Sequence, residues 1–223
     1  MDQVNLNIDT NGFKKLDGNF FKLKNDVLND FERAYENEKL SNNNHENTSI
    51  ISKLQDLKKF QQVKILYDKI NQIFLSNNIT NLEFDDIWFV KSIKDIYEPT
   101  KLPYVPHIDK IRKLKVMIYL NDVELEDGPL FITKINTIKY EEFRKNLKPD
   151  YKVKQENIIK NIDIKNFSPQ LGSLGTAIFF DTNAPHFAGK LYNNKSIRKI
   201  IRFNFRFKKQ SIIKKIYLKI FKK

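Results

Sequence analysis

The chain of 223 residues contains no cysteine and only three histidines. Without cysteine, the protein can form neither a disulfide nor a thiolate metal site, and a cysteine nucleophile is excluded. No stretch approaches 18 uninterrupted apolar residues, so the sequence predicts no membrane-spanning helix. Residues 1–12 lack a basic segment followed by an apolar run, so we expect no secretory signal and a cytoplasmic location.

The composition indicates a folded globular protein with an excess of positive charge. Hydrophobic residues make up 40% of the chain and aromatic residues 13%, which argues against disorder. The net charge of +13 favours an anionic partner such as a membrane surface, a nucleic acid or a phosphorylated substrate. The lysines accompany many asparagines and isoleucines, as AT-rich coding produces, so many of them also suit a plain solvated surface.

Helical patterns fill the first part of the chain. In residues 26–40, the apolar side chains recur at helical spacing, which predicts a helix. Residues 41–49 are polar and predict a loop. Residues 50–75 show apolar residues at intervals of three and four, which predicts a longer amphipathic helix.

Strand patterns fill the rest. Short runs of β-branched and aromatic residues, bounded by turn residues, predict strands at 86–93, 113–122, 128–135, 175–182 and 197–207. Residues 136–170 are polar and mixed, and we expect them to leave the sheet. Helices followed by strands predict a mostly β protein with α elements, in which N-terminal helices pack on a β-sandwich or barrel.

Two histidines and one carboxylate form the candidate site. His107 and Asp109 are two residues apart, so in an extended segment they point to the same side, and His186 follows directly after a predicted strand. Two histidines and one carboxylate can bind one face of a ferrous ion and leave its other positions open. Such a triplet also arises by chance, in which case the two histidines are unrelated core or turn residues.

Three stretches together resemble the Fe(II)/2-oxoglutarate dioxygenase superfamily, and most of all its phytanoyl-CoA dioxygenase branch. They are PHID (106–109), VMIYLNDVELEDGPLFI (116–132) and GSLGTAIFFDTNAPHFAGKLYNNKSIRKIIRFNF (172–205). YLND (119–122) also resembles the prolyl-hydroxylase branch. In the first hundred residues, NGFKKLDG (11–18) resembles the family's first strand.

The resemblance implies a fold, a cofactor set and a role for each residue. It implies a double-stranded β-helix, or jelly roll, as one dioxygenase domain over residues 1–207, with a helical part at 1–82 and a core at about 83–207. His107, Asp109 and His186 would bind Fe(II). Arg198 would bind the C5 carboxylate of the co-substrate 2-oxoglutarate, since its planar fork suits a carboxylate, and Arg202 is the alternative on the same strand.

The implied reaction uses O2 and 2-oxoglutarate, releases succinate and CO2, and hydroxylates an unactivated C–H bond. Asp109 favours hydroxylation, since related halogenases lose this carboxylate. Two departures from the branch stand out: FITKINT (131–137) replaces the usual continuation after Gly-Pro-Leu, and Ala188 stands where relatives often have a hydroxyl. The substrate expected is a small metabolite, lipid- or sugar-linked. The alternatives are an amino acid or protein side chain, or a jelly-roll binding protein without activity.

Residues 208–223 predict a separate basic tail. They contain seven lysines and no acid, and their apolar residues fall on one helical face. Such a helix is typical of peripheral binding to an anionic membrane, here the inner face. It equally suits a helix that packs on its own domain or on a partner. Because the tail lacks arginines and polar base-readers, we expect no nucleic-acid partner.

Overall fold

The computed structural model describes residues 4–23, 25–37, 41–43, 46–92, 102–141, 144, 159, 162–192 and 197–208. Its helices are α1 (Ile8–Asn11), α2 (Asn25–Asn37) and α3 (Gln61–Ser76), with 3-10 helices η1 (Leu54–Lys59), η2 (Thr137–Tyr140) and η4 (Ile164–Asn166). Its strands are β1 (Phe13–Leu16), β2 (Ser41–Asn43), β3 (Glu46–Ile51), β4 (Leu82–Ser92), β5 (Lys113–Tyr119), β6 (Leu130–Thr133), β7 (Phe167–Pro169), β8 (Ala177–Asp181), β9 (His186–Ala188) and β10 (Arg198–Phe207).

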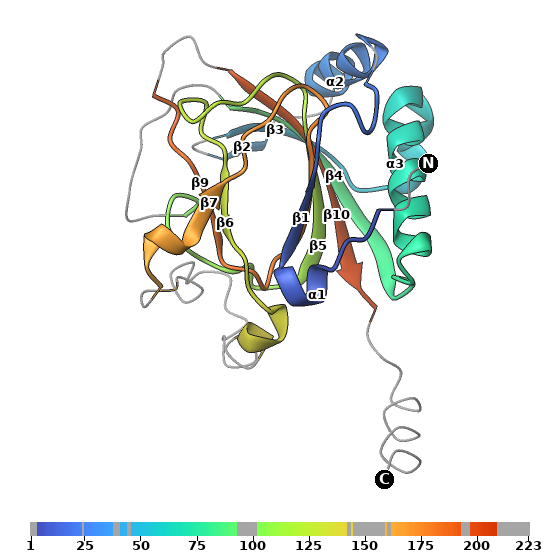
Figure 1. The fold of residues 1–223 in the computed structure, drawn as a ribbon. Coiled ribbons are helices and arrows are strands. Elements are labelled where there is room, and N and C mark those ends of the chain that lie inside the picture. The colour runs from blue at the N-terminus through green and yellow to red at the C-terminus, as the bar shows by residue number, and fades with distance from the viewer. Residues whose placement is uncertain are drawn as a thin grey trace, which may run out of the picture.

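The strands form two antiparallel sheets that face each other (Figure 1). The larger sheet has the order β1-β8-β5-β10-β4-β3-β2, and the smaller one has the order β7-β6-β9. From β5 to β10 the chain passes repeatedly between the two sheets, which is the topology of a jelly roll. The predicted fold class, a mostly β jelly roll with helices packed on it, is confirmed.

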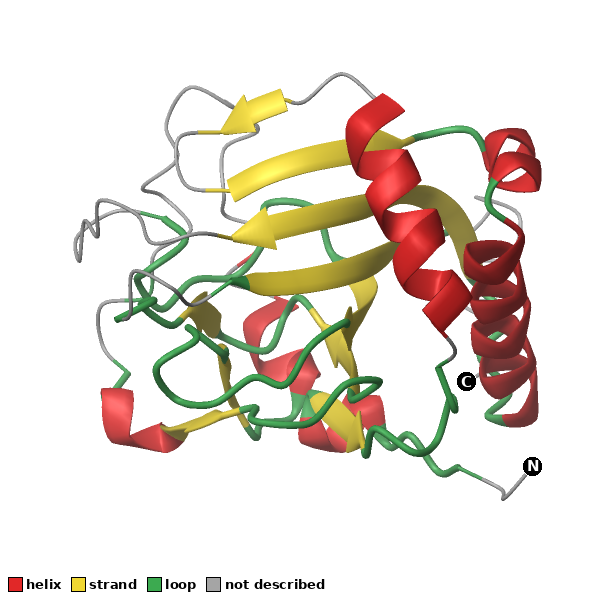
Figure 2. Ribbon diagram, turned by 90° about the horizontal axis from the view of Figure 1, so that it is seen from above, coloured by secondary structure: helices red, strands yellow, loops and turns green. Residues whose placement is uncertain are grey.

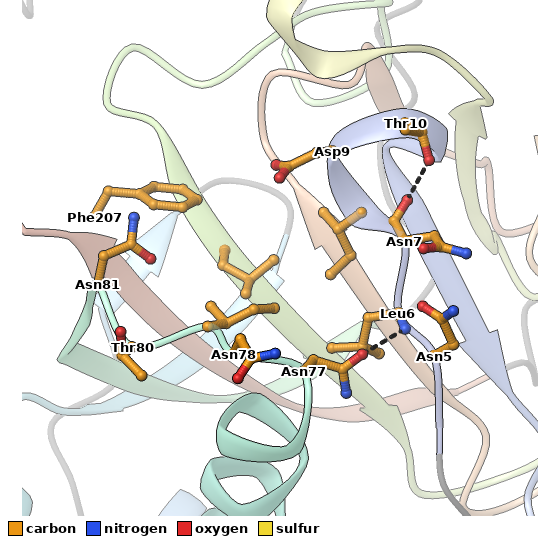
Figure 3. Close-up of a pocket in the computed structure, with 13 residues that line it drawn as sticks. Asn5, Leu6, Asn7, Asp9, Thr10, Asn77, Asn78, Thr80, Asn81 and Phe207 are labelled. Carbon is orange, nitrogen blue, oxygen red and sulfur yellow. Dashed lines mark hydrogen bonds between the residues drawn. The ribbon is translucent and has the colours of Figure 1, made fainter. Parts of the chain in front are cut away.

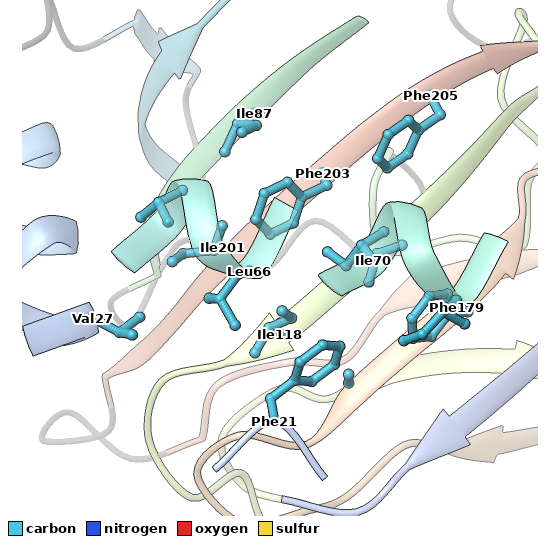
Figure 4. Close-up of a cluster of buried hydrophobic side chains, with 14 of the residues drawn as sticks. Phe21, Val27, Leu66, Ile70, Ile87, Ile118, Phe179, Ile201, Phe203 and Phe205 are labelled. Carbon is cyan, nitrogen blue, oxygen red and sulfur yellow. The ribbon is translucent and has the colours of Figure 1, made fainter. Parts of the chain in front are cut away.

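The helices α2 and α3 cover the outer face of the larger sheet (Figure 2). Their apolar stripes meet the outward side chains of the strands, and Figure 4 shows Leu66 and Ile70 of α3 against Phe203 and Phe179. Strand β10 contributes every second side chain to this core. Ile201, Phe203 and Phe205 face the helices and are almost fully buried. The alternate side chains of β10, which are Arg198, Ile200 and Arg202, point to the smaller sheet and line the cavity described below.

The predicted helix at 50–75 is wrong in its first third. Ile50 and Ile51 belong to β3, where they pair with Trp88 and Ile87 of β4, and α3 begins only at Gln61. Cross-strand pairing with a long neighbouring strand outweighs the helical spacing of these residues. The start of α3 is capped from outside, since the Asp30 carboxylate of α2 accepts hydrogen bonds from the backbone N–H groups of Gln62 and Val63.

Other predictions have mixed outcomes. The helix predicted at 26–40 is α2, and the first strand expected within 11–18 is β1. The loop predicted at 41–49 is wrong, because β2 and the start of β3 lie there. The three-residue strands β7 and β9 were not predicted. Of residues 136–170, the described part contains η2, η4 and β7.

Two further predictions concern the basic tail and membrane-spanning helices. Apart from Lys208, the basic tail lies outside them. None of the helices in the described ranges is long and apolar enough to cross a membrane.

Candidate metal centre and its cavity

Backbone pairing places the two histidines side by side. His107 and His186 exchange both hydrogen bonds, with N···O distances of 3.0 and 2.9 Å, although they lie on segments far apart in the sequence. Ile108 between His107 and Asp109 is fully buried on the opposite side, which fixes which way the segment faces. The Asp109 backbone N–H donates to the carbonyl of Thr182 at 3.3 Å, so the turn after β8 holds both ends of the site.

The imidazole rings are oriented by the carbonyls two residues before them. His107 Nδ1 lies 2.7 Å from the Val105 oxygen, and His186 Nδ1 lies 2.9 Å from the Ala184 oxygen. Because a carbonyl oxygen only accepts, each Nδ1 must carry the proton, and each Nε2 presents its lone pair to the site. The two ring centroids are 4.5 Å apart.

The Asp109 carboxylate divides its two oxygens between the histidines and a lysine. Its Oδ1 lies 3.6 Å from His186 Nε2, and its Oδ2 lies 2.5 Å from Lys115 Nζ. One ligand atom from each of His107, Asp109 and His186 lies within 4.8 Å of the others. Among the described residues, they form the one group of three or more histidine, aspartate and glutamate side chains that could hold a metal ion.

Burial and the neighbouring charges set the protonation that a metal would require. Burial, reinforced by His186, lowers the pKa of His107 to about 3, which keeps this imidazole neutral near pH 7. Burial raises the pKa of Asp109, but Lys115 and the two histidines outweigh it and hold this pKa well below its usual range. Burial lowers the pKa of Lys115 to about 8, against the opposing effect of Asp109. A neutral imidazole at His107 and an ionised carboxylate at Asp109 are the forms in which these groups bind a divalent transition metal.

Two arginines brace the segments that carry the ligands. Arg112 binds the fully buried carboxylate of Asp181 at 2.5 Å, where β8 ends. Arg144 donates to the backbone carbonyls of Asp109 and Thr182 and to the side chain of Asn183 at 2.5 Å. These contacts tie the Asp109 segment to the turn that leads into His186. The sequence analysis did not identify either arginine.

The three side chains border a cavity of about 220 Å³ between the two sheets. The other residues that line it are Trp88, Pro103, Lys115, Met117, Leu130, Phe180, Ala188, Arg198, Ile200 and Arg202. Both predicted co-substrate arginines are therefore on the cavity wall. Of the FITKINT segment, Ile132 instead packs in the core between the sheets, and it is the preceding Leu130 that reaches the cavity.

The two arginines have different surroundings. Arg198 is buried, donates to the carbonyl of Gly128, and contacts the Ser92 hydroxyl at 3.1 Å. A hydroxyl from β4 thus stands beside Arg198, while Ala188 offers none. Arg202 lies over the Trp88 ring, with its guanidinium carbon 4.1 Å from the ring centroid. Trp88 is therefore a wall of the cavity.

Lys115 is the cavity residue that the sequence analysis missed. It lies on β5 two positions before Met117, so both side chains point to the cavity. The signal was available, because a lysine on the inward side of an otherwise apolar strand is unusual.

A larger hollow of about 520 Å³ lies elsewhere, between the N-terminal segment and the end of α3 (Figure 3). Asparagines dominate its rim. Asn77 accepts from the Leu6 N–H and donates to the Val4 carbonyl, so this side chain ties the N-terminal segment to α3. The histidines and Asp109 do not line this hollow.

Comparison with solved structures gives close agreement in fold. The epimerase SnoN from nogalamycin biosynthesis, described as non-haem and α-ketoglutarate-dependent, superposes with a TM-score of 0.63 at 13% identity, over 92% of this chain and 84% of that one. EvdO2 from Micromonospora carbonacea var. aurantiaca, in complex with 2-oxoglutarate, gives 0.60 at 14% identity, over 89% and 87%. A prolyl hydroxylase from Trichoplax adhaerens, bound to a peptide fragment of hypoxia inducible factor, gives 0.57 at 15%, over 90% and 86%.

Sequence comparison adds nothing to this. No protein-family model matches the chain, and no curated protein matches it. At 13 to 15% identity, the structural likeness establishes the fold, which is the fold that the sequence motifs predicted. The likeness does not separate the phytanoyl-CoA dioxygenase branch from the other branches.

Proposed function

We propose that the protein is an Fe(II)- and 2-oxoglutarate-dependent oxygenase that hydroxylates an unactivated C–H bond of a small molecule. The observation that carries the proposal is the convergence of His107, Asp109 and His186 within 4.8 Å at a cavity whose wall also contains Arg198. The solved structures of this fold named above include complexes with 2-oxoglutarate, and SnoN is also known in complex with Fe3+, α-ketoglutarate and nogalamycin RO.

Each residue has a distinct part in the proposed reaction. The Nε2 atoms of His107 and His186 and the Oδ1 atom of Asp109 would bind the metal, since these atoms face one another. When bound, Fe(II) supplies the oxidising chemistry, in which O2 and 2-oxoglutarate are consumed, succinate and CO2 are released, and one oxygen atom enters the substrate. The protein supplies orientation within the cavity between the sheets.

Arg198 is our candidate for the C5 carboxylate of 2-oxoglutarate. Its guanidinium is buried, and the contacts with Gly128 and Ser92 hold it in place at the cavity wall. A guanidinium fixed in this way can bind a carboxylate with little loss of side-chain entropy. Arg202 is the alternative. Replacing each arginine by methionine tests the choice, since the affinity for 2-oxoglutarate should fall more in Arg198→Met than in Arg202→Met.

Anaerobic addition of Fe(II) and 2-oxoglutarate tests the proposed function directly. The wild-type protein should develop a weak visible charge-transfer band, and under air it should release succinate from 2-oxoglutarate. His107→Ala and His186→Ala should lose both signals, whereas His45→Ala, at the third histidine of the chain, is the control and should keep them. A protein that shows neither the band nor succinate is a jelly-roll binding protein with an incidental triad.

The substrate class has one alternative with an observation behind it. The prolyl hydroxylase of similar fold is bound to a peptide, and YLND (119–122) resembles that branch. A protein or amino-acid substrate would therefore come second. Succinate release stimulated by proline-containing peptides, and not by small acidic metabolites, would favour it.

We further propose that residues 1–207 form the catalytic domain and that residues 208–223 bind anionic membranes peripherally. The support is the sequence of the tail, with seven lysines and one apolar helical face. Liposomes rich in phosphatidylserine should pellet the full chain and leave a chain without 208–223 in solution. Equal soluble fractions of the two proteins would rule out membrane binding through the tail.

A further inference from the structure

The cavity carries more positive charge than the proposed cofactors can neutralise. Among the described residues that line it, Lys115, Arg198 and Arg202 accompany a single carboxylate, Asp109. A divalent metal and the two carboxylates of 2-oxoglutarate cancel each other, so three cations would face one anion. Lys115 and Arg198 are buried, and Arg202 is partly exposed. Charges held away from water without a counter-charge are costly, and the excess therefore points to a further anion in the cavity.

The three cations do not lie together. Arg198 is at the start of β10, opposite Ser92 of β4, and the contacts described above hold it there. Arg202 lies four residues further along β10, on the same face of the strand, opposite Met117 of β5 and Trp88 of β4. With Arg198 assigned to the C5 carboxylate of the co-substrate, the other two cations are left near the metal ligands.

Arg202 has no counter-charge in the part of the chain that the structure describes. Its guanidinium lies on the Trp88 ring, its Nε is buried without a hydrogen-bond partner, and within the described ranges no carboxylate forms an ion pair with it. Asp86 is the nearest acidic position on β4, two residue pairs along from Arg202, and its carboxylate binds the Asn204 amide. A guanidinium over the face of an aromatic ring still has N–H groups that can bind an oxyanion.

Lys115 is the second donor. It lies opposite Asn204 of β10, whereas Arg202 lies opposite Met117, two residues along β5 from Lys115. The two cations are close enough to repel each other. Its ammonium has three N–H donors, and its contact with Asp109 Oδ2 uses one of them. The side chain is buried against Phe180, so its remaining donors have little access to water.

We infer that Lys115 and Arg202 form a binding site for an oxyanion of the substrate, a carboxylate or a phosphate, beside the metal ligands. The inference rests on the proposed function for the identity of the neighbouring ligands. It deepens that function by naming the substrate class, an acidic molecule whose charged group binds to Lys115 and Arg202 on the cavity side of the larger sheet. Since Lys115 also contacts Asp109, the same ammonium would fix the distance between the substrate anion and the metal.

The test uses sulfate as a probe for a phosphate group and acetate as a probe for a carboxylate. Each is titrated by calorimetry, in a buffer of low ionic strength, into the protein loaded anaerobically with Fe(II) and 2-oxoglutarate. We expect one saturable site. Arg202→Met and Lys115→Met should each weaken it by about tenfold or more, as loss of a charge-assisted hydrogen bond implies. The probe that binds more tightly identifies the class of oxyanion.

Arg206→Met is the matched control, since Arg206 is a half-exposed arginine on the same strand that pairs with Asp85 outside the cavity. It should bind the probes as the wild type does. Equal affinities in the wild type, Arg202→Met and Lys115→Met would overturn the inference, as would the absence of saturable binding. A loss of 2-oxoglutarate affinity in Arg202→Met with probe binding unchanged would overturn it too, because Arg202 would then serve the co-substrate.

The charge-transfer band separates this inference from the proposed function. If the band forms and the probes fail, the oxyanion site is wrong and the oxygenase stands. If the band does not form, the oxygenase is wrong, and the same titration into the metal-free protein decides whether Lys115 and Arg202 bind an oxyanion.

Discussion

Lys115 Nζ lies 2.5 Å from Asp109 Oδ2, while Oδ1 of the same carboxylate faces His186 Nε2 at 3.6 Å. One oxygen is thus held by the ammonium, and the other is left for a metal. In the proposed enzyme, Asp109 would therefore bind the metal through Oδ1, while Lys115 would hold Oδ2.

Lys115→Met should therefore destabilise the metal-free protein, by about 3 kcal/mol, because it leaves a largely buried carboxylate without its partner. A bound divalent metal would neutralise Asp109 in place of the lysine. Saturating Ni2+ should then raise the Tm of Lys115→Met by more than it raises that of the wild type. Equal increments of Tm in the two proteins would contradict this view of the ion pair.

Gly128→Ala should weaken the binding of 2-oxoglutarate by about tenfold. Gly128 has a φ of 68°, a Cβ there would lie 2.7 Å from the Gly189 oxygen, and its carbonyl accepts from Arg198. The strain, about 1–3 kcal/mol for a residue other than glycine, should displace this carbonyl and the arginine with it. Titration of the anaerobic charge-transfer band gives the affinity.

Gly175→Ala is the control for that experiment. Gly175 has a φ of 88°, a Cβ there would lie 2.4 Å from the Gly18 oxygen, and Gly175 is not among the residues that line the cavity. It should lose stability by a similar amount and keep the affinity for 2-oxoglutarate. Equal losses of affinity in both glycine variants would mean that general destabilisation, and not the position of Arg198, is responsible.

Arg112 and Asp181 should show strong coupling in stability. The carboxylate is fully buried and the guanidinium is a quarter exposed. Arg112→Met alone should lower the free energy of unfolding by about 3 kcal/mol, because it leaves the buried Asp181 carboxylate without its ion-pair partner. Arg112→Met combined with Asp181→Asn should cost less than the sum of the two single changes, by about 1–3 kcal/mol in urea unfolding. Strict additivity would show that the pair is not a unit.

Asp85 should make the stability depend on acid pH. Burial raises its pKa, but Lys113 and Arg206, each at 2.5 Å, outweigh this and hold the pKa below the ordinary value of 3.8. Because the native carboxylate binds its proton less readily than the unfolded one, its stabilising effect is full above pH 3.8 and disappears as pH falls through the native pKa.

Asp85→Asn should accordingly have a lower Tm than the wild type at a pH of about 7. The difference between the two proteins should shrink below pH 3.8, where the wild-type carboxylate takes up its proton. Thermal unfolding followed by circular dichroism at a series of pH values measures it. A difference that stays constant into strong acid would show that Asp85 acts through packing alone.

Much of the fold followed from local patterns. The long strands β4, β5 and β10 were predictable because alternation and β-branched residues extend over many positions. The helix α2 was predictable because its apolar residues recur at helical spacing. The start of α3 was not, because its cap comes from Asp30 on another helix, and β3 was not, because only its pairing with β4 distinguishes Ile50 and Ile51 from helical residues.

The sequence by itself determined the composition of the candidate site. The spacing of His107 and Asp109, the place of His186 after a strand and the position of Arg198 are properties of the chain, since strand alternation fixes their directions. Only the tertiary structure decided the partners. The sequence marks Lys115 only as an unusual lysine on an otherwise apolar strand, and its role arises because two sheets face each other and bury its ammonium against Asp109.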